Sequence, residues 1–309
     1  MRTDSPAFGG SPRVAITGAS GLLGQELIGQ LLAVSRAESS GRQPSVFAGL
    51  HQSRWMLPTG VVPLPLDLYR ERTVRAFVEA AQADWIIHTA ALTDVDRCER
   101  EPELAQELNA KATQRLCEAV SGTPTRIVYL STDYVFKGTH GPYAEDAVPN
   151  PINVYGRTKL EGEATIRLSG DQHVIVRTAS VIGPWRKTFL DGMVEMMRDN
   201  PPLRAAIDQR SNITPVDHLA KAVIEIVEHR RSGVFHIAGG EIISRYELAI
   251  RLAQLLKLSE NAVKAVPYES LGRDAKRPLQ GGLLARQSQL SATAPSIEES
   301  LSRWINMRS

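Results

Sequence analysis

Residues 13–24 read Arg-Val-Ala-Ile-Thr-Gly-Ala-Ser-Gly-Leu-Leu-Gly, and this stretch decides the fold class. Its first five residues form a short apolar run that ends at a glycine, which is typical of a buried strand. Gly18, Gly21 and Gly24 then permit a tight turn and a close approach of the backbone to a pyrophosphate. A helix that begins directly after such a turn offers free N–H donors to the phosphates. The stretch predicts a dinucleotide-binding turn, and a plain glycine-rich turn is the alternative.

The alternation of strands and helices continues along the chain. Further apolar runs predict strands at 45–50, 61–68, 83–92, 125–136 and 173–183. Segments with apolar residues at helical spacing predict helices at 22–35, 73–82, 102–121 and 153–169. Strands that are apolar throughout and separated by helices predict a parallel sheet covered on both faces. We therefore predict an α/β protein with a Rossmann-like, doubly wound parallel sheet, whose ligands lie at the C-terminal strand ends.

The last third of the sequence has a different pattern. Helices are predicted at 188–200, 215–229, 244–257 and 295–305, and a strand at 233–239. Ser244 and Glu247 have the spacing of a capping box. We predict an NAD(P)-binding Rossmann domain at 1–177, with a loose tail at 1–12. Residues 178–309 are predicted to form a small substrate-binding cap, interleaved with the last Rossmann helix and strand at about 214–238.

Composition narrows the class of ligand. The 309 residues include 36 Lys and Arg against 34 Asp and Glu, and these charges are interspersed, which argues against a nucleic-acid partner. The longest apolar runs are strand-sized, so no membrane span is predicted, and the N-terminal tail lacks the apolar core of a signal peptide. Two cysteines, Cys98 and Cys117, indicate a reducing compartment and not a zinc site. We therefore expect a cytoplasmic protein without a structural metal.

The end of the second predicted strand bears on the choice of cofactor. NAD-binding proteins place an acidic residue there to bind the ribose 2′-hydroxyl, but residues 50–54 contain none. Ser53 and Arg54 can instead bind a 2′-phosphate, so NADPH is expected, with NADH possible. A solvent-exposed loop arginine is the alternative. Asp67 closes the third predicted strand, where it either meets the adenine or caps the following helix.

Three residues point to proton transfer. Tyr155 and Lys159 stand one helical turn apart, so they share a face of the predicted helix. A cation beside a phenol lowers its pKa from about 10, so Tyr155 can pass a proton near neutral pH. Thr132 ends the fifth predicted strand, at the crevice where ligands bind, and its hydroxyl can hydrogen-bond the same substrate oxygen.

Taken together, these motifs resemble one enzyme family over nearly the whole chain. The sequence is similar to the extended short-chain dehydrogenase/reductases and, among them, to the dTDP-4-dehydrorhamnose reductases. The most specific matches are STDYVF at 131–136 and NPINVYG at 150–156. The other matches are 18–24, 88–96, 101–102, Asn109, 142–145, 159–163, 208–209 and 277–278.

The resemblance implies roles for individual residues. It implies Tyr155 as proton donor, Lys159 as its tuner and ribose ligand, and Thr132 as the hydroxyl partner. The implied cofactor contacts are Gly18, Gly21, Leu22, Leu23, Gly24, Asp67, Leu68, Ala91, Leu92 and Thr93. Asp133 and Tyr134 are implied to contact the sugar. Asn109 is interpreted instead as a buried asparagine that bonds backbone within its own helix.

The sequence departs from the family pattern in the substrate part. Related reductases carry a tryptophan that stacks on the sugar, whereas this chain has Ser180 at that position and Trp185 five residues later. The segment 208–214 also departs from the usual DQxGxPT. We predict that Ser180 opens space above the sugar and that Trp185 fills it, with a purely structural Trp185 as the alternative. These departures concern the identity of the sugar and not the hydride chemistry.

The implied function is NADPH-dependent reduction of the 4-keto group of a nucleotide-linked 6-deoxy sugar, as in dTDP-L-rhamnose biosynthesis. One alternative is a non-catalytic regulatory protein like the beta subunit of methionine adenosyltransferase, which resembles the same family. Another is a dehydratase or epimerase, but dehydratases of this group carry Asp-Glu where this chain has Asp133-Tyr134. A homodimer is possible. The sequence does not decide the nucleotide, the stereochemistry at C4 or a requirement for Mg²⁺.

Overall fold

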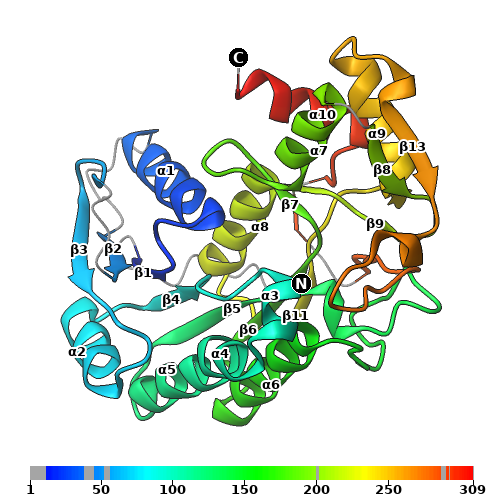
Figure 1. Cartoon of the computed structure of the whole chain (residues 1–309). Coiled ribbons are helices and arrows are strands. Elements are labelled where there is room, and N and C mark those ends of the chain that lie inside the picture. The colour runs from blue at the N-terminus through cyan, green and yellow to red at the C-terminus, as the bar shows by residue number, and fades with distance from the viewer. Residues whose placement is uncertain are drawn as a thin grey trace.

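The computed structural model describes residues 12–37, 45–51, 56–199, 202–286, 290–291 and 293–308. A seven-stranded sheet forms the centre of the larger part (Figure 1). From edge to edge its strands are β11 (Gly233–His236), β6 (Val174–Thr178), β5 (Arg126–Thr132), β4 (Trp85–His88), β1 (Arg13–Thr17), β2 (Ser45–Leu50) and β3 (Val61–Pro65). All neighbours in this sheet are parallel, and the strand order reverses between β1 and β4. The predicted α/β, Rossmann-like doubly wound fold is confirmed.

The sequence explains where the strands lie. Val14 and Ile16 of β1 and Ile87 of β4 are fully buried, as expected for strands with helices on both faces. β3 lies at the sheet edge, where its Pro63 and Pro65 remove N–H donors that a central strand would need.

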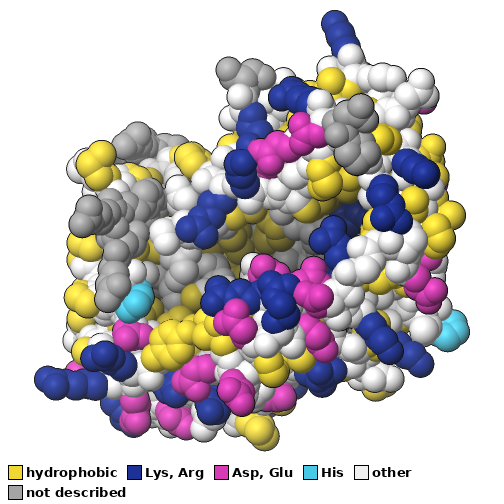
Figure 2. Space-filling model, viewed as in Figure 1, with side chains coloured by type: hydrophobic (Ala, Val, Ile, Leu, Met, Phe, Trp, Pro, Cys, Tyr) yellow, Lys and Arg dark blue, Asp and Glu magenta, His cyan; other side chains and the backbone are white. Residues whose placement is uncertain are grey.

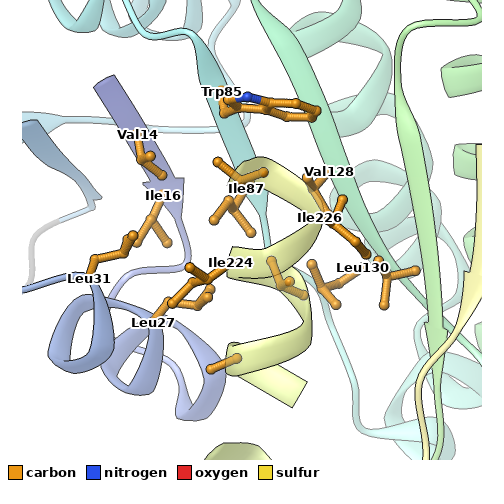
Figure 3. Close-up of a cluster of buried hydrophobic side chains, with 14 of the residues drawn as sticks. Val14, Ile16, Leu27, Leu31, Trp85, Ile87, Val128, Leu130, Ile224 and Ile226 are labelled. Atoms are coloured by element: carbon orange, nitrogen blue, oxygen red, sulfur yellow. The ribbon is translucent and has the colours of Figure 1, made fainter. Parts of the chain in front are cut away.

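Helices cover both faces of the sheet (Figure 1). One face carries α1 (Leu22–Ala37) and α8 (Val216–Glu228). Ile224 and Ile226 of α8 pack there among sheet residues such as Ile87 and Val128 (Figure 3). The other face carries α2 (Glu71–Ala81), α5 (Ala112–Val120) and α6 (Val154–Ser169). Leading into α5 are α3 (Val95–Arg100), α4 (Pro102–Ala105) and a π-helical turn at Gln106–Lys111.

Several predicted strands end earlier than expected. The third and fourth predicted strands end at Pro65 and His88. The fifth ends at Thr132, because the Thr132 hydroxyl accepts the N–H of Tyr134 and the chain turns into a 3₁₀ helix at Asp133–Val135. The sixth ends at Thr178, and Ser180 adopts a φ of 40°, which bends the chain out of the sheet. The short strand β7 (Val181–Ile182) that follows pairs with β10 (Thr214–Pro215) and not with the central sheet.

The C-terminal part has its own apolar cluster, which includes Leu190, Leu248 and Trp304. Its remaining elements are α7 (Phe189–Arg198), β8 (Leu203–Ala206), β9 (Arg210–Ser211), β12 (Ile243–Ser244), α9 (Arg245–Leu255), β13 (Val263–Val266) and α10 (Ile297–Asn306). The predicted capping box of Ser244 and Glu247 is present at the start of α9. The division at 177 stays a prediction. Among the described residues, no helix has the length and apolar character needed to span a bilayer.

Candidate active site

The glycine turn after β1 is shaped for close contact with a ligand backbone. Gly18 has a φ of 69°, and a Cβ there would lie 2.7 Å from the Thr89 hydroxyl. The N–H of Gly21 donates to the Gly18 carbonyl at 2.8 Å, which closes the turn. A Cβ on Gly24 would lie 2.4 Å from that carbonyl oxygen, so α1 approaches the turn closely. The turn therefore fits a pyrophosphate held at the start of α1, where Leu22 begins the helix.

The structure describes two of the four residues proposed for the adenosine end, Asp67 and Leu68, which follow β3. Ser53 and Arg54 lie outside the described residues. The Asp67 carboxylate accepts the N–H of Tyr69 at 3.0 Å and lies 3.2 Å from Arg70 Nε. The helix-cap alternative for Asp67 is wrong, since α2 has Arg70 at its N-cap. Leu68 packs against the apolar cluster that includes Val74 and Phe77 of α2, and the contacts of Asp67 and Leu68 with the adenine stay predictions.

The loop after β4 is held by Asn109, which makes two hydrogen bonds to Leu92. The Leu92 N–H donates to Asn109 Oδ1 at 2.8 Å, and Asn109 Nδ2 donates to the Leu92 carbonyl at 3.1 Å. Asn109 Nδ2 also lies 3.2 Å from the Thr158 hydroxyl of α6. The interpretation of Asn109 as bonding within its own helix is therefore wrong. It ties the loop with Ala91, Leu92 and Thr93, proposed to line the cofactor, to the helix that carries Tyr155.

Helix α6 places Tyr155 and Lys159 in its first two turns. Asn153 caps the helix by accepting the Gly156 N–H at 2.8 Å. A Cβ on Gly156 would lie 2.1 Å from the Tyr134 carbonyl oxygen, so only glycine lets the helix start this close to the end of β5. This close approach brings Tyr155 within hydrogen-bonding reach of Thr132.

Burial is the largest influence on the pKa values of Tyr155 and Lys159. Burial raises the pKa of Tyr155 well above its usual value, and the hydrogen bond with Thr132 opposes that shift. The expected lowering of the phenol pKa is therefore not found in the ligand-free protein. Burial also lowers the pKa of Lys159 to about 7, with Glu163 opposing it. The Lys159 ammonium lies 4.0 Å from the centroid of the Tyr129 ring.

Asp133 lies at the same strand end and is also buried. Its carboxylate accepts hydrogen bonds from Thr132 at 3.2 Å and from Ser211 at 2.9 Å. Burial raises its pKa to about 6, although these hydrogen bonds and the charge of Arg245 oppose the shift. The neighbouring Tyr134 ring meets that of Tyr155 edge to face, with centroids 5.8 Å apart. The predicted sugar contacts therefore surround the predicted proton donor.

Ser180 and Trp185, where the sequence differs from the family's substrate-binding pattern, lie in different surroundings. The Ser180 hydroxyl accepts a hydrogen bond from Arg245 Nη2 at 2.8 Å. Trp185 is 48% exposed, and its indole N–H donates to Glu26 of α1 at 2.8 Å. Trp185 thus lies against the helix that follows the glycine turn, and its proposed contact with the sugar stays a prediction.

Sequence reasoning missed Ser211 and Arg245, which the C-terminal part brings to Asp133. Ser211 lies in β9, which pairs with β12, and Arg245 follows directly after β12. Neither belongs to a motif, although the departure at 208–214 marked the segment that holds Ser211. Figure 2 shows a hollow in this face of the molecule, with Lys and Arg as well as Asp and Glu side chains both above and below it. Among the described residues, no cluster of three or more His, Cys, Asp or Glu could hold a metal ion.

Comparisons with known proteins place this chain in a family. The sequence model described as the RmlD substrate binding domain matches residues 12–308. The chain belongs to the RmlD family. This membership confirms the resemblance and the enzyme class predicted from the motifs.

Individual known proteins match over most of their length. The dTDP-4-keto-6-deoxy-D-glucose reductase of Streptomyces niveus is 32% identical over 268 residues, covering 86% of each chain. Methionine adenosyltransferase 2 subunit beta of Xenopus laevis is 29% identical over 273 residues, covering 85% of this chain and 77% of that protein. The Bacillus anthracis dTDP-4-dehydrorhamnose reductase, solved in complex with NADP, superposes with a TM-score of 0.81 at 27% identity and covers 96% of this chain and 99% of that one.

Proposed function

We propose that this protein is an NAD(P)-dependent oxidoreductase that reduces the 4-keto group of a nucleotide-linked 6-deoxy sugar. The observation that carries the proposal is the meeting of Thr132, Tyr155 and Lys159 at the end of β5, in a chain of the RmlD family. A dTDP sugar and NADPH are the proposed partners, the latter because of Ser53 and Arg54. A cytoplasmic location and a homodimer are part of the same proposal.

The chain's own residues divide the work of such a reduction. The bound nicotinamide cofactor supplies the hydride. The glycine turn and the start of α1 hold its pyrophosphate, and Lys159 donates to its ribose. Hydride addition to a ketone builds negative charge on the carbonyl oxygen. Thr132 orients that oxygen, and Tyr155 donates its phenol proton to it, which is the step that general acid catalysis accelerates.

The raised pKa of Tyr155 suits this role in the resting protein. A phenol whose pKa is raised keeps its proton and is ready to donate it. Lys159, whose pKa is lowered by burial to about 7, lies one helical turn from Tyr155 and can restore the proton. The Lys159 ammonium rests on the Tyr129 ring and forms no ion pair with a carboxylate among the described residues. It is therefore available for a hydrogen bond with a ligand.

The test is NADPH oxidation by the purified protein with dTDP-4-keto-6-deoxy-L-mannose. Turnover supports the proposed reductase. An inactive protein that still binds NADPH favours the regulatory alternative, which the similarity to methionine adenosyltransferase 2 subunit beta keeps in view. A protein that binds neither NADPH nor NADH contradicts both.

A further inference from the structure

Arg245 is a partly buried cation that has few partners among the described residues. It begins α9, directly after the cap residue Ser244. Its guanidinium donates one hydrogen bond, from Nη2 to the Ser180 hydroxyl at 2.8 Å, and stacks on the Phe189 ring at 4.4 Å. A guanidinium carries five N–H donors, so most of those on Arg245 have no partner among the described residues.

Asp133 is the acidic residue whose charge acts on this cation. The negative charge of Asp133 and the positive charge of Arg245 interact, yet no ion pair within 4.0 Å joins them among the described residues. Thr132 and Ser211 each give the carboxylate one hydrogen bond. A carboxylate has about four lone-pair sites, so it can accept further hydrogen bonds.

Other arginines of the same region are paired. Arg277 Nη1 lies 2.8 Å from Asp96, and Arg177 makes two hydrogen bonds to Glu163. Withdrawing a cation from water without pairing it is costly, and burial indeed lowers the pKa of Arg245. The unpaired donors of Arg245 therefore indicate a ligand group that completes the set.

We propose that Arg245 joins Asp133, for which the family resemblance already implies a sugar contact, in binding one hydroxyl group of the substrate sugar, which donates to the carboxylate and accepts from the guanidinium. This inference rests on the proposed function. A phosphate or carboxylate would be repelled by Asp133, and an amine by Arg245. A hydroxyl is both donor and acceptor, and at about 2.8 Å from each partner it spans a separation that is too long for an ion pair.

Chemistry narrows this hydroxyl to the one on C3. Asp133 follows Thr132 in the chain and accepts its hydrogen bond, and Thr132 is the residue proposed to hold the C4 oxygen. The ring neighbours of C4 are C3 and C5. In a 6-deoxy sugar C5 carries a methyl group, so the neighbouring hydroxyl is at C3. The pair thus selects substrates that keep the C3 hydroxyl.

The experiment compares kcat/KM for dTDP-4-keto-6-deoxy-L-mannose with that for its 3-deoxy and 2-deoxy analogues. We expect the 3-deoxy analogue to lose roughly 10- to 100-fold, as for a lost hydrogen bond to a charged group, and the 2-deoxy analogue to lose much less. Arg245→Met should lower kcat/KM for the parent sugar and abolish its advantage over the 3-deoxy analogue. The matched control is Arg251→Met on the same helix, which removes surface ion pairs to Glu241 and Glu298 and should leave the advantage intact.

Several outcomes overturn the inference. It fails if the wild type uses the 3-deoxy analogue as well as the parent sugar, or if Arg245→Met lowers both rates equally. NADPH binding verifies that the Arg245→Met variant is folded. If that variant does not fold, Arg245→Lys, which keeps the charge but loses the planar donors, takes its place in the comparison. If the wild type reduces none of the sugars, the proposed function fails separately. Calorimetric binding of dTDP-6-deoxy-L-mannose with and without its 3-hydroxyl then decides the inference.

Discussion

Two neighbouring turns of helix α6 each carry a buried charged side chain, and only one of the two is in an ion pair among the described residues. Glu163 accepts hydrogen bonds from Arg177 Nε at 2.8 Å, from Arg177 Nη2 at 2.7 Å and from Ser131 at 2.6 Å. Lys159, one turn earlier and equally buried, has no ion pair among the described residues and rests on the Tyr129 ring. The first arrangement is closed, because its charges satisfy one another, whereas the second leaves donors available.

The difference separates structural charge from charge kept for a ligand. A buried ion pair with all its hydrogen bonds holds β5, β6 and α6 together. A buried cation without a carboxylate lowers stability until a ligand binds it. Lys159 and Arg245 both belong to this second kind among the described residues. The pairing of a buried cation, and not its burial alone, distinguishes the site from the core.

The largest effect is expected at Tyr155, which lies one helical turn before the unpaired Lys159. Tyr155→Phe keeps the ring and removes only the hydroxyl, so kcat should fall by roughly 10²- to 10⁴-fold through loss of general acid catalysis. Steady-state kinetics measure the change, and cofactor affinity should be nearly intact because the ring still fills its place. Near-normal turnover by this variant would refute Tyr155 as the proton donor.

Breaking the buried ion pair of Glu163 and Arg177 should instead lower stability. Glu163→Gln leaves Arg177 buried beside a neutral partner, and we expect the free energy of unfolding to fall by about 3–5 kcal/mol. Urea unfolding measures the loss. Glu161→Gln, at an exposed position of the same helix, is the control and should change stability by about 0.5 kcal/mol or less. An equal effect of both substitutions would show that the buried pair is not special.

A third prediction concerns a cation outside the described residues. Arg54 is proposed to bind the 2′-phosphate, so Arg54→Ala should weaken NADPH binding by roughly 10-fold or more while leaving NADH binding unchanged. Binding titrations with both cofactors decide the matter. Equal losses for the two cofactors would remove the basis for a preference.

The smallest change in stability is expected from removing the unpaired charge of Lys159 itself. Lys159→Met should raise the free energy of unfolding of the ligand-free protein by about 1 kcal/mol at pH 6, while abolishing activity. With the Lys159 pKa lowered to about 7, the buried charge costs most below pH 7. Between pH 7 and pH 10.5 only the unfolded chain binds this proton, so wild-type stability rises with pH. The gain from the variant should therefore shrink over that range, and a gain independent of pH would contradict it.

The sequence was sufficient for what is encoded locally. The glycine turn, the spacing of Tyr155 and Lys159, and the capping box at Ser244 each involve residues that are close in the chain. Ser211 and Arg245 reach Asp133 only because β9 pairs with β12, and no local pattern reports such a pairing. The pKa of Tyr155 was predicted in the wrong direction for a related reason, since burial is a property of the whole fold.

The late position of helix α8 in the sequence has a consequence for the nascent chain during synthesis. Its apolar face covers β1 and β4, yet it is encoded long after them, beyond the first elements of the C-terminal part. During synthesis, one face of the half-finished sheet emerges from the ribosome before its cover exists. A nascent chain that ends near residue 177 therefore presents Ile87 and Val128 to solvent, which makes a chaperone a natural partner of the growing chain.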